Sequence, residues 1–383
     1  MNRRAGGVPA IVGIDDGASD NEARPCIEIG ARAAVRALAD AGLALRDVDG
    51  VLAAYSWEEP SLMFASELAD YLGLTPDYAE TVCFGGASPA MMVARATRAI
   101  EAGVCEVALL MAASNRRSKL GRAAAIAGLR DVLSPEFEVP YGAFVPAVYA
   151  LAAARHMHER ATTPEHLAAV AVTQRAHALQ HPQAEQRAPL TAADVLASPI
   201  IAAPLRLLDC CLITDFGGAL VIVGPETAKR LAQRVWVLGT GEAHGRLSTA
   251  EAESLTSRGA ARSGARALRQ AGVGTEDIDF AELYDSFTIT VLATLEDLGF
   301  CEPGAAGPLA VSGAFGEDGM LPLNTNGGML SYRTGGLSHV VEAVHQLRGT
   351  APGLRLPQPR LGLVHGIGGV LSAHCTLILG GDA

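Results

Sequence analysis

The stretch ALADAGLALRDVDGV, residues 37–51, returns later in the chain as ALRQAGVGTEDIDFA, residues 267–281. The two copies are offset by 230 residues, as Gly42 and Gly272 or Asp49 and Asp279 illustrate. Each copy predicts an amphipathic helix, a glycine that ends it in the left-handed conformation, and an apolar strand, at 48–56 and 278–287. The sequence therefore predicts two similar α/β halves.

A second pair of segments supports this duplication. GGASPAMMVARATRAIEAG (85–103) and GGLSHVVEAVHQLRG (335–349) share a Gly-Gly-x-Ser opening, a helical pattern and a closing glycine. Each precedes an apolar strand, EVALLMAAS (106–114) and RLGLVHGIG (360–368). Strands that alternate with helices are typical of parallel sheets covered on both faces. We place the halves at residues 1–230 and 231–383, joined near 225–235.

The region between the repeated segments, about 115–205, is rich in Ala, His, Arg and Pro. It is too long and too periodic for a plain loop. Within it, VPAVYALAAARHMHERA (145–161) has a helical pattern. We expect this region to form a helical excursion over the N-terminal half.

Composition excludes several classes of protein. The 383 residues carry a net charge of −11, which disfavours nucleic-acid binding because phosphate would be repelled. The longest apolar stretch, VCEVALLMAA (104–113), is interrupted by Glu106 and is far shorter than the roughly 20 residues of a membrane span. The seven cysteines form no C-x-x-C pair, so neither a zinc clip nor a disulfide framework is indicated. We expect a cytoplasmic protein with no membrane span and no metal site.

Three segments together resemble the thiolase superfamily. They are DFGGALVIVG (215–224), NTNGGMLSYRTGGLSHVVEAVHQLRG (324–349) and HGIGGVLSAHCTLILG (365–380). The resemblance covers nearly the whole chain and is closest to the sterol-carrier-protein type of thiolase and the related lipid-transfer-protein aldolases. It implies an α/β, thiolase-like five-layered αβαβα fold made of two duplicated halves with mixed, mostly parallel sheets.

The thiolase nucleophile is missing from its place. Thiolases carry a reactive Cys where the helix after the first Gly-rich turn begins, because a helix N-terminus lowers the pKa of a thiol. The resemblance puts Gly86 of FGGASPA at that position. Cys83 lies three residues earlier. It is either a small buried residue near a strand end or the nucleophile of a differently built turn.

Two further motifs carry tyrosines. The family motif of Asn or His followed by an acid reads YDSF here, which puts Tyr284 at the Asn or His position and Asp285 after it. Where the family has Gly-His-Pro, this chain has NGGMLSYRTGG with Tyr332. The related aldolases rely on two tyrosines in these motifs, so the resemblance implies that Tyr284 and Tyr332 are catalytic and that Asp285 orients its neighbours. The alternatives are a packed ring, a turn residue and a structural carboxylate.

A fourth motif begins at His365 and continues HGIGG. His365 would stand where the family places Cys, Asn or His, and an imidazole suits proton transfer. A structural histidine at the start of a Gly-rich turn is the alternative. Main-chain N–H groups at Gly86, Gly366 and Gly368 are suited to hold an oxyanion or a thioester oxygen.

Other basic side chains are weaker candidates for functional residues. Arg116, Arg117, Lys119 and Arg122 follow a strand end and would either meet the phosphates of coenzyme A or form a solvated loop. His339 and His345 are interpreted as packing or surface residues.

These features imply a CoA-dependent C–C lyase that cleaves a bulky β-hydroxyacyl-CoA by a retro-aldol reaction to a ketone or aldehyde plus a short acyl-CoA. Coenzyme A would be part of the substrate, and no permanently bound cofactor is expected. One alternative is an acetyl-CoA acyltransferase that uses Cys83, and another is a non-catalytic thiolase-fold assembly subunit. The resemblance also implies a homodimer and a small OB-fold, zinc-ribbon partner subunit that helps to hold acyl-CoA.

Overall fold

The computed structural model describes residues 7–17, 23–119, 133–142, 144–256, 259–335 and 337–382. Within them the predicted duplication is confirmed, element by element, at the offset of 230 residues. The paired elements are helices α1 (Cys26–Ala41) and α10 (Ala260–Ala271), short helices η1 (Leu45–Asp47) and η6 (Thr275–Asp277), and strands β2 (Gly50–Ala54) and β9 (Phe280–Leu283). Gly42 and Gly272 end the two helices with φ values of 69° and 75°, the left-handed conformation that glycine adopts without strain.

Nine strands form one continuous ladder in the order β3-β2-β4-β7-β1-β8-β11-β10-β9. The N-terminal half contributes β1 (Ala10–Asp15), β2, β3 (Tyr78–Val82), β4 (Val107–Ser114) and β7 (Phe216–Val223). The C-terminal half contributes β8 (Val235–His244), β9, β10 (Leu361–Gly368) and β11 (Ala373–Gly380). The halves join where β1 meets β8, and only Ala10 with Trp236 and Ile11 with Val235 are paired there. The ladder is therefore two half-sheets with a narrow seam.

The expected mixture of parallel and antiparallel pairing is confirmed, but its distribution differs from the expectation. Parallel pairs lie toward the outer edges, at β2–β3, β2–β4 and β9–β10. The other pairs between the described strands are antiparallel, at β1–β7, β4–β7, β8–β11 and β10–β11 within the halves and at β1–β8 between them. Parallel pairing therefore belongs to the crossover units and does not predominate at the centre.

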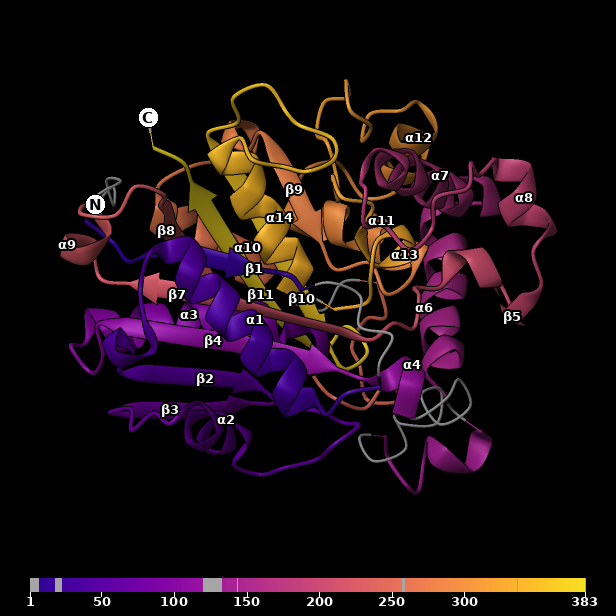
Figure 1. Cartoon of the computed structure of the whole chain (residues 1–383). Coiled ribbons are helices and arrows are strands. Elements are labelled where there is room, and N and C mark those ends of the chain that lie inside the picture. Colours follow the sequence, from indigo (N-terminus) through magenta and orange to yellow (C-terminus); the bar gives the residue numbers. More distant parts are fainter. Residues whose placement is uncertain are drawn as a thin grey trace.

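Helices separate and cover the two half-sheets, which gives the expected five layers (Figure 1). Helices α3 (Ser88–Glu101) and α14 (Leu337–Arg348) contact strands of both halves and form the central layer. Helix α1 covers the outer face of β1, β4 and β7, and α10 covers β8 and β11. Strand β4 illustrates the layering, since Leu109 and Met111 join the outer core while Ala108 and Leu110 join the central one.

Smaller elements complete the two halves. They are α2 (Phe64–Leu72), η2 (Gly85–Ala87) and α9 (Pro225–Ala228) in the N-terminal half, and α11 (Thr288–Leu298), α12 (Ala306–Val311) and α13 (Gly328–Ser331) in the C-terminal half. Helix α9 lies just before β8, at the predicted junction of the halves. The boundary at residues 230 and 231 stays a prediction.

The helical excursion exists, but the prediction that it covers the N-terminal half is wrong. Its described elements are α4 (Arg116–Lys119), η4 (Val139–Tyr141), α6 (Val145–Arg160), α7 (Pro164–Gln180), α8 (Ala192–Ala197), β5 (Ile200–Ala202), β6 (Leu205–Arg206) and η5 (Leu207–Asp209). Helices α6 and α7 pack against α11, α12 and α13 of the C-terminal half (Figure 1). Buried hydrogen bonds fix this contact, from Arg175 to Ser331 at 2.9 Å and from His156 to Glu296 at 3.2 Å.

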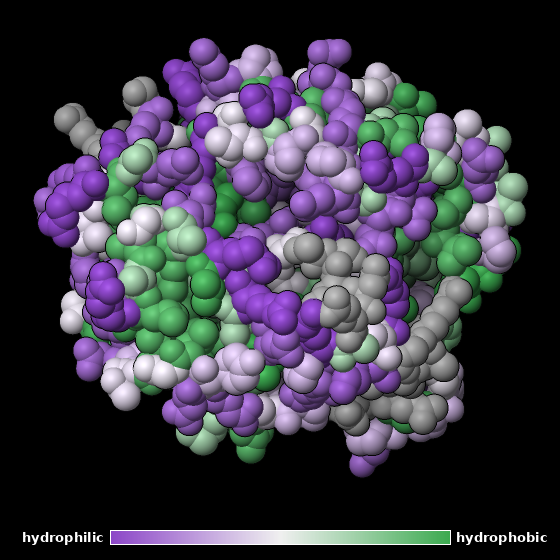
Figure 2. Space-filling view, in the orientation of Figure 1, coloured by the Kyte–Doolittle hydropathy of each residue, from purple (hydrophilic) through white to green (hydrophobic). Residues whose placement is uncertain are grey.

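Figure 2 shows charged and polar residues over much of one face of the molecule, with a continuous apolar area at the left of the view. Across the described part of the chain, no helix combines the length and the apolar character that crossing a membrane requires.

Candidate active site

Tyr284 fills the space above Gly86. Gly86 lies in η2, directly before α3, and Tyr284 follows β9. A Cβ atom built on Gly86 would lie 2.2 Å from Cε2 and Cζ of Tyr284 and 2.5 Å from its hydroxyl oxygen. Real Cβ atoms do not approach other atoms so closely, so any side chain at position 86, a cysteine included, would displace the phenol. The tyrosine of one half thus occupies the space in which a side chain at position 86 of the other half would lie.

The surroundings of Tyr284 keep its hydroxyl protonated. Its main-chain N–H donates to the carbonyl of His365 at 2.9 Å, which fixes the residue to β10. Burial raises the pKa of Tyr284 far above its usual range, and the nearby Tyr149 and Cys211 raise it further. The cation of Arg116 opposes this shift and does not overcome it. At neutral pH the group is therefore a phenol, which can donate a hydrogen bond or a proton.

Asp285 is fully buried beside this tyrosine and ties three segments together. Its carboxylate accepts the main-chain N–H of Met329 at 2.9 Å and that of Leu330 at 3.1 Å, both in α13. It also contacts Nε2 of His339 on α14 at 2.9 Å. Gly328 has a φ of +59°, and a Cβ there would lie 2.3 Å from Oδ2 of Asp285. The glycine turn thus lets α13 approach the carboxylate closely.

Tyr332 lies in a different environment. Its side chain has no exposed surface, and its hydroxyl donates a hydrogen bond to the carboxylate of Asp16. The ring packs against His181 at 4.5 Å between centroids and lies under the guanidinium of Arg333. Burial raises the pKa of Tyr332 and also that of Asp16. The structure therefore places Tyr332 in a buried acid–phenol pair.

His365 stands in the interior of β10, so the prediction that it begins a turn is wrong. The strand continues to Gly368 because His365 is paired with Thr376 on β11 and with Leu283 on β9. Its Nδ1 lies 2.8 Å from Oγ1 of Thr376 and its Nε2 lies 3.1 Å from Nδ1 of His374. Burial lowers the pKa of His365, and His374 lowers it further.

The side chain of His365 points away from Gly86. Neighbouring residues of a strand face opposite sides, and a Cβ on Gly366 would lie 3.1 Å from Cα of Ala87, so Gly366 faces the η2 turn. His365 faces the other side, where Thr376 bonds to Ser263 of α10 at 2.9 Å. The structure therefore brings Tyr284 together with Gly86 and leaves His365 behind the sheet.

The glycines of the two Gly-rich turns lie in direct contact. A Cβ on Gly368 would lie 1.8 Å from the carbonyl oxygen of Phe84, and one on Gly366 would lie 3.3 Å from that of Gly86. Gly85 approaches Gly368 and Gly369 in the same way. The absence of side chains on β10 therefore allows the main chain of 84–87 to pack directly on the strand.

Cys83 is exposed and nothing around it favours a thiolate. Desolvation raises the pKa of its thiol, and no opposing cause accompanies it. Reactive cysteines have the opposite environment, with a cation or a helix N-terminus that lowers the pKa.

The basic cluster is neutralised by acids. Arg116 contacts Glu58 at 2.6 Å, and Arg117 contacts Glu185 at 3.2 Å. Lys119 lies 3.5 Å from a carboxylate oxygen of Glu59. Arg122 is outside the described residues. The phosphates of coenzyme A would have to compete with these carboxylates.

Sequence reasoning missed a buried carboxyl pair, Glu282 on β9 and Glu342 on α14. Oγ1 of Thr325 lies 2.9 Å from Oε1 of Glu282 and 2.6 Å from Oε1 of Glu342. A hydroxyl has one hydrogen to donate, so one of the two carboxyl groups must be protonated to complete these bonds. Burial raises the pKa of both groups, and Glu342 raises that of Glu282 further. A charged residue inside the apolar patterns FAEL and VVEAV was the available signal.

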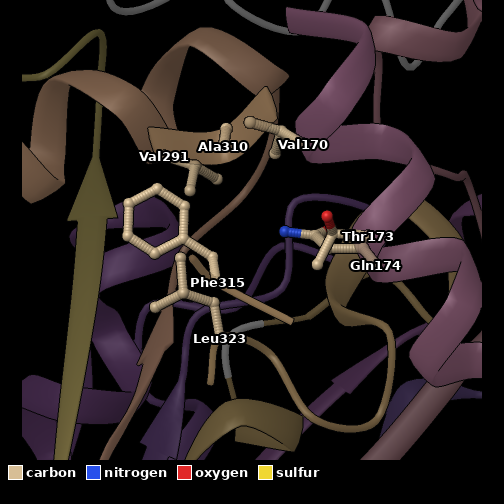
Figure 3. Close-up of a pocket in the computed structure, with 7 residues that line it drawn as sticks. All are labelled: Val170, Thr173, Gln174, Val291, Ala310, Phe315 and Leu323. Carbon is tan, nitrogen blue, oxygen red and sulfur yellow. The ribbon is translucent and has the colours of Figure 1, made fainter. Parts of the chain in front are cut away.

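A small cavity lies between α7 and the C-terminal helices (Figure 3). Its volume is about 10 Å³, room for about one water molecule, and Val170, Val291 and Phe315 are among its lining residues. The amide of Gln174, which also lines it, has no hydrogen-bond partner among the described residues. The cavity is far too small for an acyl-CoA.

Comparison with known proteins identifies the family. A family model described as "Thiolase C-terminal domain-like" matches residues 241–381. The chain is 34% identical over 364 residues to a protein of Mycobacterium tuberculosis named 17-hydroxy-3-oxo-4-pregnene-20-carboxyl-CoA lyase, with 90% of this chain and 92% of the relative covered. It is 31% identical over 349 residues to an acetyl-CoA acetyltransferase of Methanothermobacter thermautotrophicus, with 88% and 90% covered.

A solved structure agrees with these relatives. The structure of an aldolase named "Ltp2-ChsH2(DUF35) aldolase" superposes with a TM-score of 0.89 at 32% identity and covers 98% of both chains. The duplicated halves, the five layers and the Gly-rich turns at 85–86 and 366–369 accord with this likeness. The chain belongs to the thiolase superfamily, in the branch of the sterol-carrier-protein-type thiolases and their related aldolases.

Proposed function

We propose that the protein cleaves a bulky β-hydroxyacyl-CoA by a retro-aldol reaction, releasing a ketone or aldehyde and a shortened acyl-CoA. The observation that carries this proposal is the packing of the Tyr284 phenol into the space above Gly86. A thiolase needs a thiol in that place to accept an acyl group. A retro-aldol cleavage needs none, because its second product leaves as a neutral carbonyl compound.

The reaction requires three groups and is balanced in protons. A base takes the proton of the β-hydroxyl, the Cα–Cβ bond breaks as the new C=O bond forms, and the electron pair moves into the thioester as an enolate. A hydrogen-bond donor stabilises the enolate oxygen, and an acid then protonates Cα. Returning the hydroxyl proton to that acid resets the site.

Tyr284 fits the role of the acid or the enolate donor. Burial raises its pKa, so it carries its proton at neutral pH. Tyr332 and His365 remain candidates that are harder to place. Each is buried, with the Tyr332 hydroxyl bonded to Asp16 and both His365 ring nitrogens bonded to other side chains. In both residues the polar side-chain atoms are therefore already engaged by other side chains.

Substrate and partner follow from the relatives. The lyase named above acts on a steroid-carboxyl-CoA, so a steroid or similarly bulky acyl-CoA is our first substrate class, with coenzyme A as part of the substrate. The solved aldolase is named together with a second component, ChsH2(DUF35). We propose that this chain also works with a small partner subunit of that kind and forms a homodimer.

A second candidate function is acyl transfer by Cys83. Its support is the likeness to an acetyl-CoA acetyltransferase and the exposure of the thiol. The raised pKa of Cys83 disfavours it, since the thiolate is the nucleophile.

Product analysis separates these functions. The purified chain, alone and with a co-expressed DUF35 protein, is incubated with 17-hydroxy-3-oxo-4-pregnene-20-carboxyl-CoA and analysed by mass spectrometry. A ketone and a shortened acyl-CoA support the aldolase. A covalent acyl adduct on the protein after incubation with acetyl-CoA, lost in Cys83→Ala, would favour the acyltransferase instead. No turnover of any CoA ester would contradict both.

A further inference from the structure

Asp285 and His339 form a buried pair beside Tyr284. Nε2 of His339 lies 2.9 Å from Oδ1 of Asp285, and the two residues are 0% (Asp285) and 2% (His339) exposed. The imidazole ring lies 6.4 Å from the Tyr284 ring between centroids. The pair therefore stands next to the phenol that covers Gly86.

The hydrogen bonds of Asp285 decide where the imidazole carries its hydrogen. Met329 and Leu330 donate main-chain N–H groups to the carboxylate, which acts as an acceptor throughout. Nε2 of His339 must then be the donor in its contact with the same carboxylate. In a neutral imidazole this leaves Nδ1 unprotonated, with a lone pair available.

Nδ1 of His339 is buried and has no hydrogen-bond partner among the described residues. An unpaired polar atom inside a protein costs about 1–3 kcal/mol, so it calls for an explanation. His156 and His365 are as deeply buried, yet each has partners at both ring nitrogens. His339 thus combines an orienting carboxylate on one nitrogen with an unused acceptor on the other.

We propose that His339 is the base that accepts the proton of the substrate's β-hydroxyl at Nδ1, and that Asp285 is its positioning residue. This inference rests on the proposed function and supplies the base which that function lacks, since Tyr284 is protonated. The O–H bond breaks as the N–H bond forms, and the Cα–Cβ pair becomes the enolate. Asp285 stabilises the imidazolium, which then returns the proton by way of the acid that protonated Cα.

Among the described residues, the other ionisable groups near His339 include Tyr284 and Asp285, which follow β9, and Glu342, which lies one turn along α14. Because Glu342 bonds to Thr325 and Gln346, it is already engaged in its own network. The pair of Asp285 and His339 is therefore separate from the carboxyl pair behind it.

The test compares two histidines of the same helix. In His339→Gln we expect kcat for cleavage of 17-hydroxy-3-oxo-4-pregnene-20-carboxyl-CoA to fall by about 10²–10⁴-fold while KM changes little. The control, His345→Gln, lies farther along α14 and contacts Thr350, and it should keep wild-type kcat.

A second measurement needs no substrate. ¹⁵N NMR of histidine-labelled wild-type protein should report Nε2 protonated and Nδ1 bare for His339, and Asp285→Asn should disturb this tautomer. Wild-type kcat in His339→Gln or an Nδ1-protonated tautomer would each overturn the proposal. If wild-type protein gives no cleavage while the NMR tautomer is as expected, the proposed function has failed rather than the geometry of the pair.

Discussion

The two copies of the helix–glycine–strand unit have nearly the same backbone and different chemistry. Helix α1 with Gly42 and β2 matches α10 with Gly272 and β9 at an offset of 230 residues. At that offset Tyr284 corresponds to Ala54 and Glu282 to Leu52. The first copy thus ends in small and apolar side chains, whereas the second carries a phenol and a buried carboxyl.

The difference extends beyond the strands. After β2, Ser56 contacts Cys26 of α1 at 3.3 Å, a bond within the N-terminal half. After β9, Asp285 holds α13 and α14 together and Tyr284 reaches across to Gly86 in the other half. The two copies therefore share a backbone, but the second copy is the one followed by Tyr284 and Asp285, and Tyr284 contacts Gly86 of the other half.

Replacing Tyr284 with alanine, the residue at the corresponding position of the first copy, should have the largest effect on turnover. Tyr284→Ala is expected to lower turnover by about 10²–10⁴-fold, because it removes the proton donor from the site. The strand should survive, since the bond from Tyr284 to His365 is between main-chain groups. A turnover assay measures the loss of activity, and circular dichroism measures whether the fold is retained. Retained turnover with an intact fold would remove Tyr284 from the chemistry.

Adding a side chain at Gly86, where it contacts Tyr284, should have the next largest effect, a loss of unfolding free energy. Gly86→Ala would bring a Cβ within 2.2 Å of the Tyr284 ring, and overpacking of this kind costs about 1–3 kcal/mol of unfolding free energy. In the Tyr284→Ala background the cost should shrink, because the ring is gone. Urea unfolding of the four proteins of this cycle measures the coupling. Equal costs in both backgrounds would show that the two residues do not share this space.

The carboxyl partner of Glu282, Glu342 on α14, should make stability depend on pH. The pKa of Glu342 is raised in the folded protein above its usual 4.5, so its stabilising contribution is present at pH 4.5 and below and is lost as pH rises through the folded value. Glu342→Gln cannot ionise, and its unfolding free energy should fall less between pH 5 and pH 8, by roughly 1–3 kcal/mol. Urea titrations at both values measure this. An equal fall of the unfolding free energy in the wild type and in Glu342→Gln would contradict this role of Glu342.

Where the copies agree, substitutions should act alike and weakly. Gly42→Ala and Gly272→Ala each place a Cβ in the left-handed conformation, which costs about 1 kcal/mol. Thermal unfolding should give similar losses for both. A loss of thermal stability in one of the two variants and not in the other would contradict the expected equivalence of the two helix ends.

Local patterns predicted much of the fold. The repeat at an offset of 230, the closing glycines and the apolar strands each correspond to elements with nearly the predicted bounds. The side on which the excursion packs was not predictable in this way, because Arg175 and His156 find their partners through contacts distant in sequence. The strand predicted at 360–368 already contained His365, but the turn expected to begin there is absent, because the glycines after it let the main chain of 84–87 pack on the strand.

The candidate site was predictable only in part. The strand predicted at 278–287 contained Tyr284 and Asp285, whereas β9 ends at Leu283 and both residues follow it. The glycine at position 86 was visible in the sequence. The contact between Tyr284 and Gly86, and the pair of Asp285 and His339, join residues separated by many tens of positions. One sequence alone carries no signal for such distances, so His339 looked like an ordinary helix residue.

A side-by-side turnover assay of Tyr284→Phe and Cys83→Ala decides whether the phenol has replaced the thiol. Tyr284→Phe keeps the ring over Gly86 and removes the hydroxyl alone, whereas Cys83→Ala removes the exposed thiol. With 17-hydroxy-3-oxo-4-pregnene-20-carboxyl-CoA as substrate, we predict that Tyr284→Phe loses cleavage by about 10²-fold or more and that Cys83→Ala cleaves at the wild-type rate. Full activity in Tyr284→Phe together with loss in Cys83→Ala would contradict the proposed retro-aldol chemistry.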